Sequence, residues 1–375
     1  MNDIPLAFSP CPDYATENVV RAVDALIASL GGWAAFVKPG DRVLVKVNML
    51  SDHAPEDAVT THPEVLRAVL RGLLAAGAKP KVGDSPASAV GVPRIWQKTG
   101  VQAVCEAEGV PLVPFEGDGA REVERDGIRF TLSPAMNDVD KVVNLPKVKT
   151  HALMTFTCGV KNLYGFIPGY QKAVLHKRYP RPHAFAKVLR AIEAEVKPVL
   201  TLADGVVGME GEGPSAGTPK PLGFLAASPD PYRLDCALAE LLGMPLRSVP
   251  YLAHLAKDPM YAQALPAEAE AFRPVSFKIP STARTRLIPT WLVHRIAPLV
   301  WVRPFIDAAK CIRCGRCVAS CPVKTLAMGR PTPFLSKPSA CIGCCCCHEM
   351  CPEKAIEMRQ SLLLRLYGAY KKDLK

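Results

Sequence analysis

The residues best suited to chemistry in this 375-residue chain are cysteines near its C-terminus, which form two runs of the same spacing. Each run reads C-x-x-C-x-x-C-x-x-x-C-P, the first from Cys311 to Pro322 and the second from Cys341 to Pro352. Thiolates are soft ligands that bind iron, zinc and copper. Clustered C-x-x-C pairs in a chain of this size indicate metal binding in a reducing compartment more than disulfide pairing.

The spacing is that of two-cluster bacterial ferredoxins, in which three cysteines of each run hold one [4Fe-4S] cluster and the fourth ligates the other cluster. The predicted ligand sets are Cys311, Cys314, Cys317 and Cys351 for one cluster, and Cys341, Cys344, Cys347 and Cys321 for the second. Zinc is the alternative, but it takes four ligands in two pairs, not two triplets each followed by Cys-Pro. Cys345 and Cys346 are left over, as buried fillers, spare ligands or redox-active thiols.

Basic residues in the middle of the chain form a second candidate site. Lys147, Lys149, His151, Lys161 and His176 lie within one short stretch, and KVKTH directly follows the apolar run KVVNLP. Such a set suits a carboxylate or a phosphate. The alternative is a solvated basic loop, but Lys161 lies in the apolar stretch CGVKNLYGF, where burial lowers a lysine pKa towards nucleophilic or general-base use. We therefore predict Lys161, His151 and His176 as catalytic residues.

The elements that must position these residues can be predicted from apolar periodicity between Thr16 and about residue 282. Helices are predicted at 16–32, 60–78, 94–108, 153–164, 183–196 and 231–243, strands at 41–48, 80–84, 110–116, 141–146, 199–204 and 222–228, and a hairpin at 121–132. This alternation predicts an α/β fold, a mostly parallel sheet with helices on both faces.

Open α/β sheets bind ligands beyond the carboxyl ends of their strands, and polar residues concentrate there in this sequence. Turns and helix caps also favour Asp, Asn and Ser, but that does not explain the lysines. The glycine-rich stretch 204–217 fits neither the P-loop nor the dinucleotide pattern, and we expect a flap there. The predicted substrate-binding residues are Lys46, Asn48, Asp84, Lys147, Lys149, Asn162, Asp204 and Glu210.

Charge and composition divide the chain. We expect an α/β domain at 1–281, a basic and aromatic linker at 282–305, a small α+β two-cluster ferredoxin-like domain at 306–358, and a basic tail helix at 359–375. Residues 282–375 hold 16 Lys and Arg against 5 Asp and Glu, which equals the whole net charge of +11.

The basic C-terminal part favours an acidic redox protein as partner. Nucleic acid is disfavoured, because few aromatic residues are interleaved for stacking. Contact with a membrane surface is an alternative role for 282–305, whereas prolines and charges interrupt any spanning helix there. The N-terminus carries no secretory signal pattern, so we expect the cytoplasm.

Several motifs of the larger domain, in order along the chain, resemble the DUF362 family. They are VLVKVN (43–48), TTHPEVLRAVLRGLLAAGA (60–78), GDSP (83–86), VVNLPKVKTH (142–151), CGVKNLYGFIPG (158–169), His176, MEGEGPSAGTPK (209–220) and SPDPYRLDCALAELLG (228–243). Val47 departs from the pattern, where we expect Lys-Pro-Asn. The resemblance implies a functional site in this domain, often joined to a C-terminal double-cluster module, without implying its chemistry.

Two functions are consistent with these observations. The first is an iron-sulfur oxidoreductase, or a component of one, whose clusters exchange electrons with an anionic substrate or cofactor held in the lysine-rich crevice. The second is an electron-transfer or metallocofactor-assembly accessory that acts on a protein partner.

Overall fold

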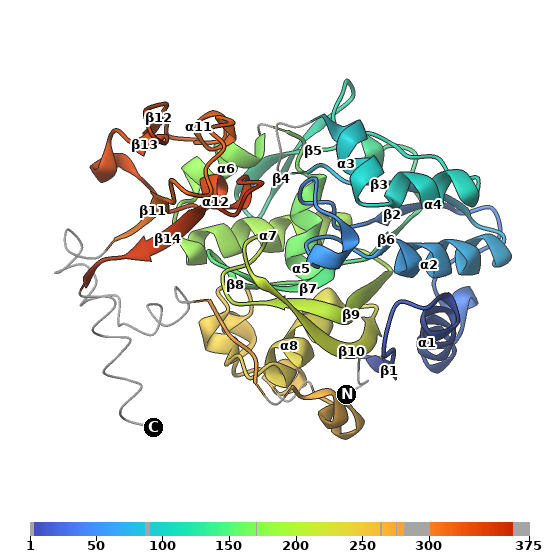
Figure 1. The fold of residues 1–375 in the computed structure, drawn as a ribbon. Helices are drawn as coiled ribbons and strands as arrows, with labels where there is room; N and C mark the ends of the chain where they lie inside the picture. The colour runs from blue at the N-terminus through green and yellow to red at the C-terminus, as the bar shows by residue number, and fades with distance from the viewer. Residues whose placement is uncertain are drawn as a thin grey trace.

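A sheet of eight strands runs through the larger part of the molecule (Figure 1). The computed structural model describes residues 4–86, 91–169, 171–262, 265–274, 276–280 and 301–362. The strands are β1 (Ala7–Pro10), β2 (Arg42–Lys46), β3 (Lys79–Gly83), β6 (Lys141–Asn144), β7 (Lys147–His151), β8 (Thr155–Thr157), β9 (Leu200–Glu210) and β10 (Thr218–Ser228). Their main order is β1-β10-β9-β6-β2-β3, with β7 joined to β9 and β8.

The centre of this sheet is parallel: β2 pairs in parallel with β3 and β6, and β9 with β6 and β7. β1, β10 and β8 add antiparallel pairs at the margins. In β2, Val43 and Val45 face one hydrophobic core while Leu44 faces the other, because successive side chains of a strand point to opposite faces. The strand is therefore buried on both sides, and the predicted α/β fold is confirmed.

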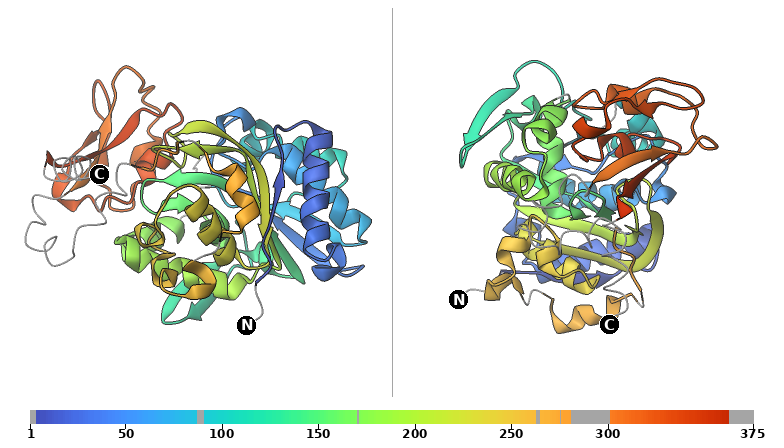
Figure 2. Two further views of the ribbon diagram at one scale, coloured as in Figure 1. Left: turned by 90° about the horizontal axis from the view of Figure 1, so that it is seen from below. Right: turned by 90° about the vertical axis from the view of Figure 1, so that its left-hand side faces the viewer.

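Helices cover both faces of the sheet, as Figures 1 and 2 show. α1 (Thr16–Ser29), α2 (Pro63–Ala75), α3 (Val92–Lys98) and α4 (Val101–Ala107) pack on one side, and α5 (Gly159–Asn162), α7 (Pro182–Val196) and α8 (Pro231–Leu241) on the other. The other helices are α6 (Gln171–Arg178), with eight residues, and α9 (Pro259–Ala262), with four.

Local sequence signals explain where α2 and α8 begin. In α2, Pro63 occupies the first turn, and the ring of His62 accepts the backbone N–H of Glu64 at 3.2 Å. In α8, the carboxylate of Asp230 accepts the backbone N–H of Tyr232 at 2.7 Å. These caps satisfy backbone donors that a helix start leaves without partners.

Four predicted elements were wrong in part. The single helix expected at 94–108 is two helices, α3 and α4, separated at Gly100, whose φ is 75°. The helix expected at 153–164 is β8 followed by α5 and a 3₁₀ turn, because Thr155–Thr157 finds a ladder partner in β7. The strand expected at 110–116 makes only a single bridge, from Leu112 to Val82, since two prolines remove backbone donors there. The first half of the flap expected at 204–217 is strand, because β9 continues to Glu210, and only 211–217 forms a loop before β10 begins at Thr218.

The hairpin expected at 121–132 forms, as β4 (Arg121–Arg125) and β5 (Ile128–Leu132). Asp126 and Gly127 at its tip both have positive φ, at 52° and 72°. This is the backbone that a tight two-residue hairpin turn requires, and it explains the Asp-Gly pair.

The C-terminal module is built from two similar halves beside the larger domain (Figure 1). β11 (Val302–Ile306) pairs with β14 (Ile356–Gln360), β12 (Leu326–Ala327) pairs with β13 (Phe334–Leu335), and α11 (Arg316–Ala319) contacts α12 (Cys346–Glu349). The module thus begins at Val302, inside the linker expected at 282–305, and β14 takes the first two residues of the expected tail helix. The rest of that linker up to 300, and 363–375, lie outside the described residues. Within the described ranges, no helix has the length and apolar character needed to cross a bilayer.

Candidate functional site

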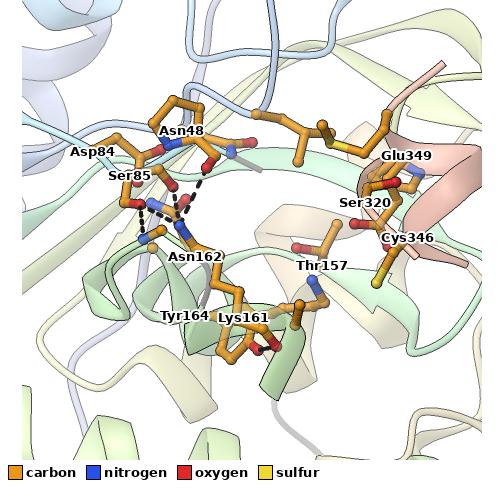
Figure 3. A pocket seen from close by; sticks show the side chains of 18 of the residues that line it. Asn48, Asp84, Ser85, Thr157, Lys161, Asn162, Tyr164, Ser320, Cys346 and Glu349 are labelled. Carbon is orange, nitrogen blue, oxygen red and sulfur yellow. Dashed lines mark hydrogen bonds between the residues drawn. The ribbon is translucent and has the colours of Figure 1, made fainter. Parts of the chain in front are cut away.

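A cavity of about 420 Å³ lies between the α/β domain and the C-terminal module. Figure 3 shows Asn48, Asp84 and Ser85 on one side of it and Ser320, Cys346 and Glu349 on the other. Its size falls in the range of small-molecule sites. The cavity lining includes eight of the eleven predicted catalytic and substrate-binding residues: Lys46, Asn48, Asp84, Lys149, His151, Lys161, Asn162 and His176.

Lys46 forms a buried ion pair at one wall of this cavity. It ends β2, and its Nζ lies 2.7 Å from Oδ1 of Asp84, which follows the neighbouring parallel strand β3. The second oxygen of Asp84 accepts the backbone N–H of Met49 at 2.7 Å, and Lys46 also donates to the carbonyl oxygen of Val47 at 2.6 Å. Burial lowers the pKa of Lys46 and Asp84 opposes this effect. The pair is satisfied within the protein, so it shapes the wall and fixes the β2 and β3 ends.

Lys172, on α6, lines the same wall of the cavity. Its Nζ donates to the carbonyl oxygen of Ser85 at 2.6 Å and also contacts the hydroxyl of Ser85, which in turn donates to Glu116. Burial is the main cause that lowers the pKa of Lys172 to about 7. The other carboxylate oxygen of Glu116 is buried and has no hydrogen-bond partner among the described residues. It is available to a ligand that donates a hydrogen bond.

Like Lys172, the cavity lysines Lys149 and Lys161 have no carboxylate partner in the described part of the chain. Nζ of Lys149 donates to the carbonyl oxygen of Val59 at 2.7 Å, and burial followed by the nearby Lys161 lowers the pKa of Lys149 to about 7. Lys161, on α5, stands over the Tyr164 ring with its Nζ 5.8 Å from the centroid. No acceptor within hydrogen-bond distance of this Nζ is found in the described ranges, and burial lowers its pKa. Lys161 is therefore free to bind an anion, and Lys149 keeps at least one N–H beyond the one that Val59 accepts.

His151 connects the α/β domain to the C-terminal module. Its Nδ1 accepts the backbone N–H groups of Leu153 and Met154 at 3.0 and 3.3 Å, so the proton of the neutral ring lies on Nε2. That Nε2 lies 3.1 Å from Oε1 of Glu349 on α12. Burial lowers the pKa of His151 to about 3, which keeps the ring neutral. Burial acts to raise the pKa of Glu349, but His151 and Lys161 lower it by more, so Glu349 is a carboxylate.

His176, on α6, is the remaining ring in the cavity. It stacks on Phe185 with 4.3 Å between ring centroids and meets the edge of Tyr164. Burial lowers its pKa to about 4, and its Nδ1 has no hydrogen-bond partner among the described residues. This neutral ring offers one nitrogen to a bound molecule.

Three predicted substrate-binding residues lie outside the cavity. Lys147 pairs with Asp204 at 2.8 Å, with neither side chain exposed, and the β7–β9 register places these residues directly opposite each other. Tyr14 closes the network, because its hydroxyl donates to Asp204 at 2.8 Å and accepts from Lys147 at 2.6 Å. The register shifts between Lys147 and Lys149, so only the residues after this irregularity reach the cavity. Glu210, at the end of β9, accepts the backbone N–H of Lys278 at 2.9 Å.

The eight predicted cluster cysteines surround two small cavities in the C-terminal module. One is lined by Cys311, Cys314, Cys317 and Cys351, and the other by Cys321, Cys341, Cys344 and Cys347. Each cavity therefore takes three cysteines from one run and the fourth from the other, which is the arrangement of a two-cluster ferredoxin. No three His, Cys, Asp or Glu side chains of the described ranges converge closely enough to hold a single metal ion. The donor set thus fits iron-sulfur clusters.

The two cysteines outside these sets have different surroundings. Cys345 is buried beside the second small cavity, and Cys346 lines the large cavity, where its thiol acts to raise the pKa of Lys161. Among the described residues, Cys346 is thus the one cysteine of the run CIGCCCCHEMCP that lines the large cavity.

Ion pairs hold the C-terminal module against the α/β domain beside the cavity. The buried carboxylate of Asp52 lies 3.1 Å from Arg316 on α11 and 3.2 Å from Arg94 on α3. His348 on α12 adds a hydrogen bond of 3.0 Å between its Nε2 and the carbonyl oxygen of Glu212. These contacts join the module to two separate parts of the larger domain.

Comparison with known proteins agrees with this architecture. Residues 43–240 match the model of a family described as "Domain of unknown function (DUF362)". The chain belongs to the DUF362 family. Residues 303–352 match a 4Fe-4S dicluster domain, so the C-terminal module is an iron-sulfur domain. The DUF362 match covers the strands and helices that supply most of the cavity wall.

A relative of this DUF362 chain is the thylakoid-associated protein sll1697 of Synechocystis sp. The two are 38% identical over 244 residues, which is 64% of this chain and 75% of the relative. Among solved structures, the lactate racemase apoprotein of Thermoanaerobacterium thermosaccharolyticum aligns at 14% identity and a TM-score of 0.42, and a Thermotoga maritima protein at 17% and 0.35. These alignments cover 63% and 56% of this chain, and 57% and 54% of the two solved chains.

Several cavity residues of this DUF362 chain were not among the predicted catalytic and substrate-binding residues, including Lys172, Glu116, Cys346 and Glu349. Glu116 had a usable signal, because it follows an apolar run. Lys172 lies three residues after Gly169, at the end of a motif that resembles the family, and proximity to that motif was its only signal. Cys346 and Glu349 had none, because nothing in a ferredoxin-type run indicates which of its side chains faces another domain.

Proposed function

We propose that this protein moves electrons between two [4Fe-4S] clusters and an anionic small molecule bound in the lysine-lined cavity. The observation that carries the proposal is that α12 takes part in both sites. This helix bears Cys347, which lines the second small cavity, and it also contributes Cys346 and Glu349 to the wall of the large cavity. A molecule bound among the lysines therefore lies one short helix away from a cluster.

In this proposal the clusters supply or accept single electrons, and the chain's own residues bind the molecule. The ligand sets are the two groups of four cysteines that surround the small cavities. Lys149 and Lys161 pair with the anion, because their ammonium groups have no carboxylate partner among the described residues. His151 holds Glu349 in place through its Nε2–H, and His176 offers an uncharged ring nitrogen to the molecule.

The test follows reoxidation of reduced clusters. The protein is purified without oxygen, reduced with dithionite, freed of the reductant and mixed with small molecules released from heat-denatured protein. Reoxidation is followed by the loss of the reduced-cluster electron paramagnetic resonance signal. We expect the Lys161→Met variant to keep its iron and to reoxidise at least about tenfold more slowly than the wild type. A tenfold effect corresponds to about 1.4 kcal/mol of lost binding free energy.

The matched control is Lys187→Met, which removes an exposed lysine from α7. It should reoxidise like the wild type. Reoxidation of Lys161→Met at the wild-type rate would remove the cavity from the proposal.

A location in the cytoplasm stays a prediction. The Synechocystis relative is described as thylakoid-associated, so membrane fractions are worth including in the source of small molecules.

A further inference from the structure

Exposed apolar side chains gather on the iron-sulfur module. Seven large hydrophobic residues of the described ranges are exposed, and Phe305, Ile312, Met328 and Phe334 among them belong to this module. Ile312 lines the small cavity of the first cysteine set, Met328 lies against Gly315 of the same loop, and Phe334 lies against Gly329. Ile312 is 62% exposed and Phe334 52%, so these side chains are available to a partner.

Basic residues are interspersed in the sequence with these exposed apolar residues. Residues 307–340 hold six Lys and Arg and a single acid, Asp307, which lies 3.8 Å from Lys310. Five of the six are exposed: Lys310, Arg313, Lys324, Arg330 and Lys337. Glu353 is an exposed carboxylate at the same cavity, but the balance of charge is clearly positive. Exposed apolar side chains together with polar or charged ones are the usual composition of a protein interface.

The two cysteine sets differ in exposure. In the first set Cys314 is exposed and Cys317 is buried, whereas in the second set no cysteine is exposed and both Cys344 and Cys347 are buried. Both sets share a short helix with the large cavity, but α12 of the second set places Cys346 and Glu349 near Lys161, whereas α11 of the first set contributes only Ala319. The first set is therefore the more exposed of the two, and the second lies nearer Lys161.

We propose that the face formed by Ile312, Arg313, Met328, Arg330 and Phe334 docks an acidic redox protein that reduces the cluster held by Cys311, Cys314, Cys317 and Cys351. This proposal rests on the proposed function and adds the direction of electron transfer. Electrons enter at the exposed cluster and are used at the cavity. In each encounter the reduced centre of the partner loses one electron and the [4Fe-4S]²⁺ cluster becomes [4Fe-4S]¹⁺. No bond or proton changes place. Charge attraction speeds the encounter and the apolar side chains exclude water from the contact.

The experiment uses a photoreduced plant-type [2Fe-2S] ferredoxin, an acidic protein, as the donor in stopped-flow mixing with the oxidised holoprotein. We expect the second-order rate constant to fall by at least about tenfold from low to high salt, because screening removes the attraction. Arg313→Glu combined with Arg330→Glu should lower the low-salt rate constant by at least about tenfold. Reduction by the methyl viologen radical should stay at the wild-type rate in every variant.

The matched control is Arg125→Glu with Arg129→Glu on the β4–β5 hairpin, which makes the same change in net charge far along the chain from the cysteines. An equal slowing by this control, or no slowing by the first pair, would overturn the docking face. If the variant with Arg313→Glu and Arg330→Glu loses iron, Phe334→Ser is tested in its place, and we expect the same fall in the low-salt rate constant. Loss of binding to anionic lipid vesicles with ferredoxin reduction unchanged would assign the face to a membrane and also overturn it.

These outcomes are separate from those of the proposed function. Protein reduced by methyl viologen bypasses the docking face, so its reoxidation by the cavity ligand tests the cavity alone. A failure there leaves the ferredoxin result standing.

Discussion

Replacing Lys147 by methionine should destabilise the protein, and the cost can be worked out from its surroundings. Lys147 and Asp204 are both fully buried and 2.8 Å apart. Removing one partner of a buried ion pair costs about 3–5 kcal/mol, because the other charge stays behind. Asp204 would keep the Tyr14 hydroxyl at 2.8 Å and the backbone N–H of His62 at 2.9 Å, so we expect about 3 kcal/mol.

The assay is equilibrium unfolding in urea without oxygen, followed by far-ultraviolet circular dichroism. At a slope of about 3 kcal/mol per molar urea, this loss moves the midpoint of the α/β domain down by about 1 M. Lys147→Met combined with Asp204→Leu should recover most of the stability, since no unpaired charge remains. The comparison is Lys161→Met, which should shift the midpoint little or upwards, because Lys161 has no acceptor among the described residues.

A different pattern would refute this reasoning. If Lys147→Met left the midpoint unchanged and abolished cluster reoxidation by the cavity ligand, Lys147 would be a substrate-binding residue, as its sequence motif suggested. The buried pair would then be an incorrect description of its role.

Two further predictions concern the cavity and the clusters. Sulfate, used as a simple anion, should bind best below about pH 7 and more weakly as the pH rises, because burial and Lys161 lower the pKa of Lys149 to about 7 and only protonated Lys149 attracts the anion. Calorimetry across this pH range should show the trend, and Lys149→Met should flatten it. Sulfate binding that strengthens as the pH rises would contradict the prediction. Iron analysis should find about eight iron atoms in wild type and in the Cys345→Ala and Cys346→Ala variants but about four in Cys347→Ala, and a full complement in Cys347→Ala would contradict the ligand sets.

The sequence predicted the parts of the fold that depend on local patterns. The β2 strand and the helices α2 and α8 follow from apolar periodicity and from caps such as Asp230, because these signals act over a few residues. The sequence did not predict the segments whose secondary structure depends on pairing with residues far along the chain. Thr155–Thr157 forms a strand because it pairs with β7. The stretch after Asp204 is extended because it pairs with β10.

The same division applies to the candidate site. The cysteine spacing alone predicted both ligand sets, because three thiolates on a tight turn can cap only one cluster and the fourth must reach across. The lysine-rich motif located a basic site, but the sequence could not separate Lys147 from Lys149. That separation depends on the register shift in β7, which directs one lysine to Asp204 and the other to the cavity.

The sequence by itself thus determined that the chain carries an iron-sulfur module and an α/β domain with basic motifs, because ligand spacing and apolar period are local properties. Only the tertiary structure decided that the two meet. Glu349 and Cys346 lie nearly two hundred residues beyond Lys161 in the chain, and they share its cavity because the module packs over the ligand edge of the sheet. No local pattern encodes such a contact, since it depends on the complementary shapes and charges of two separately folded surfaces.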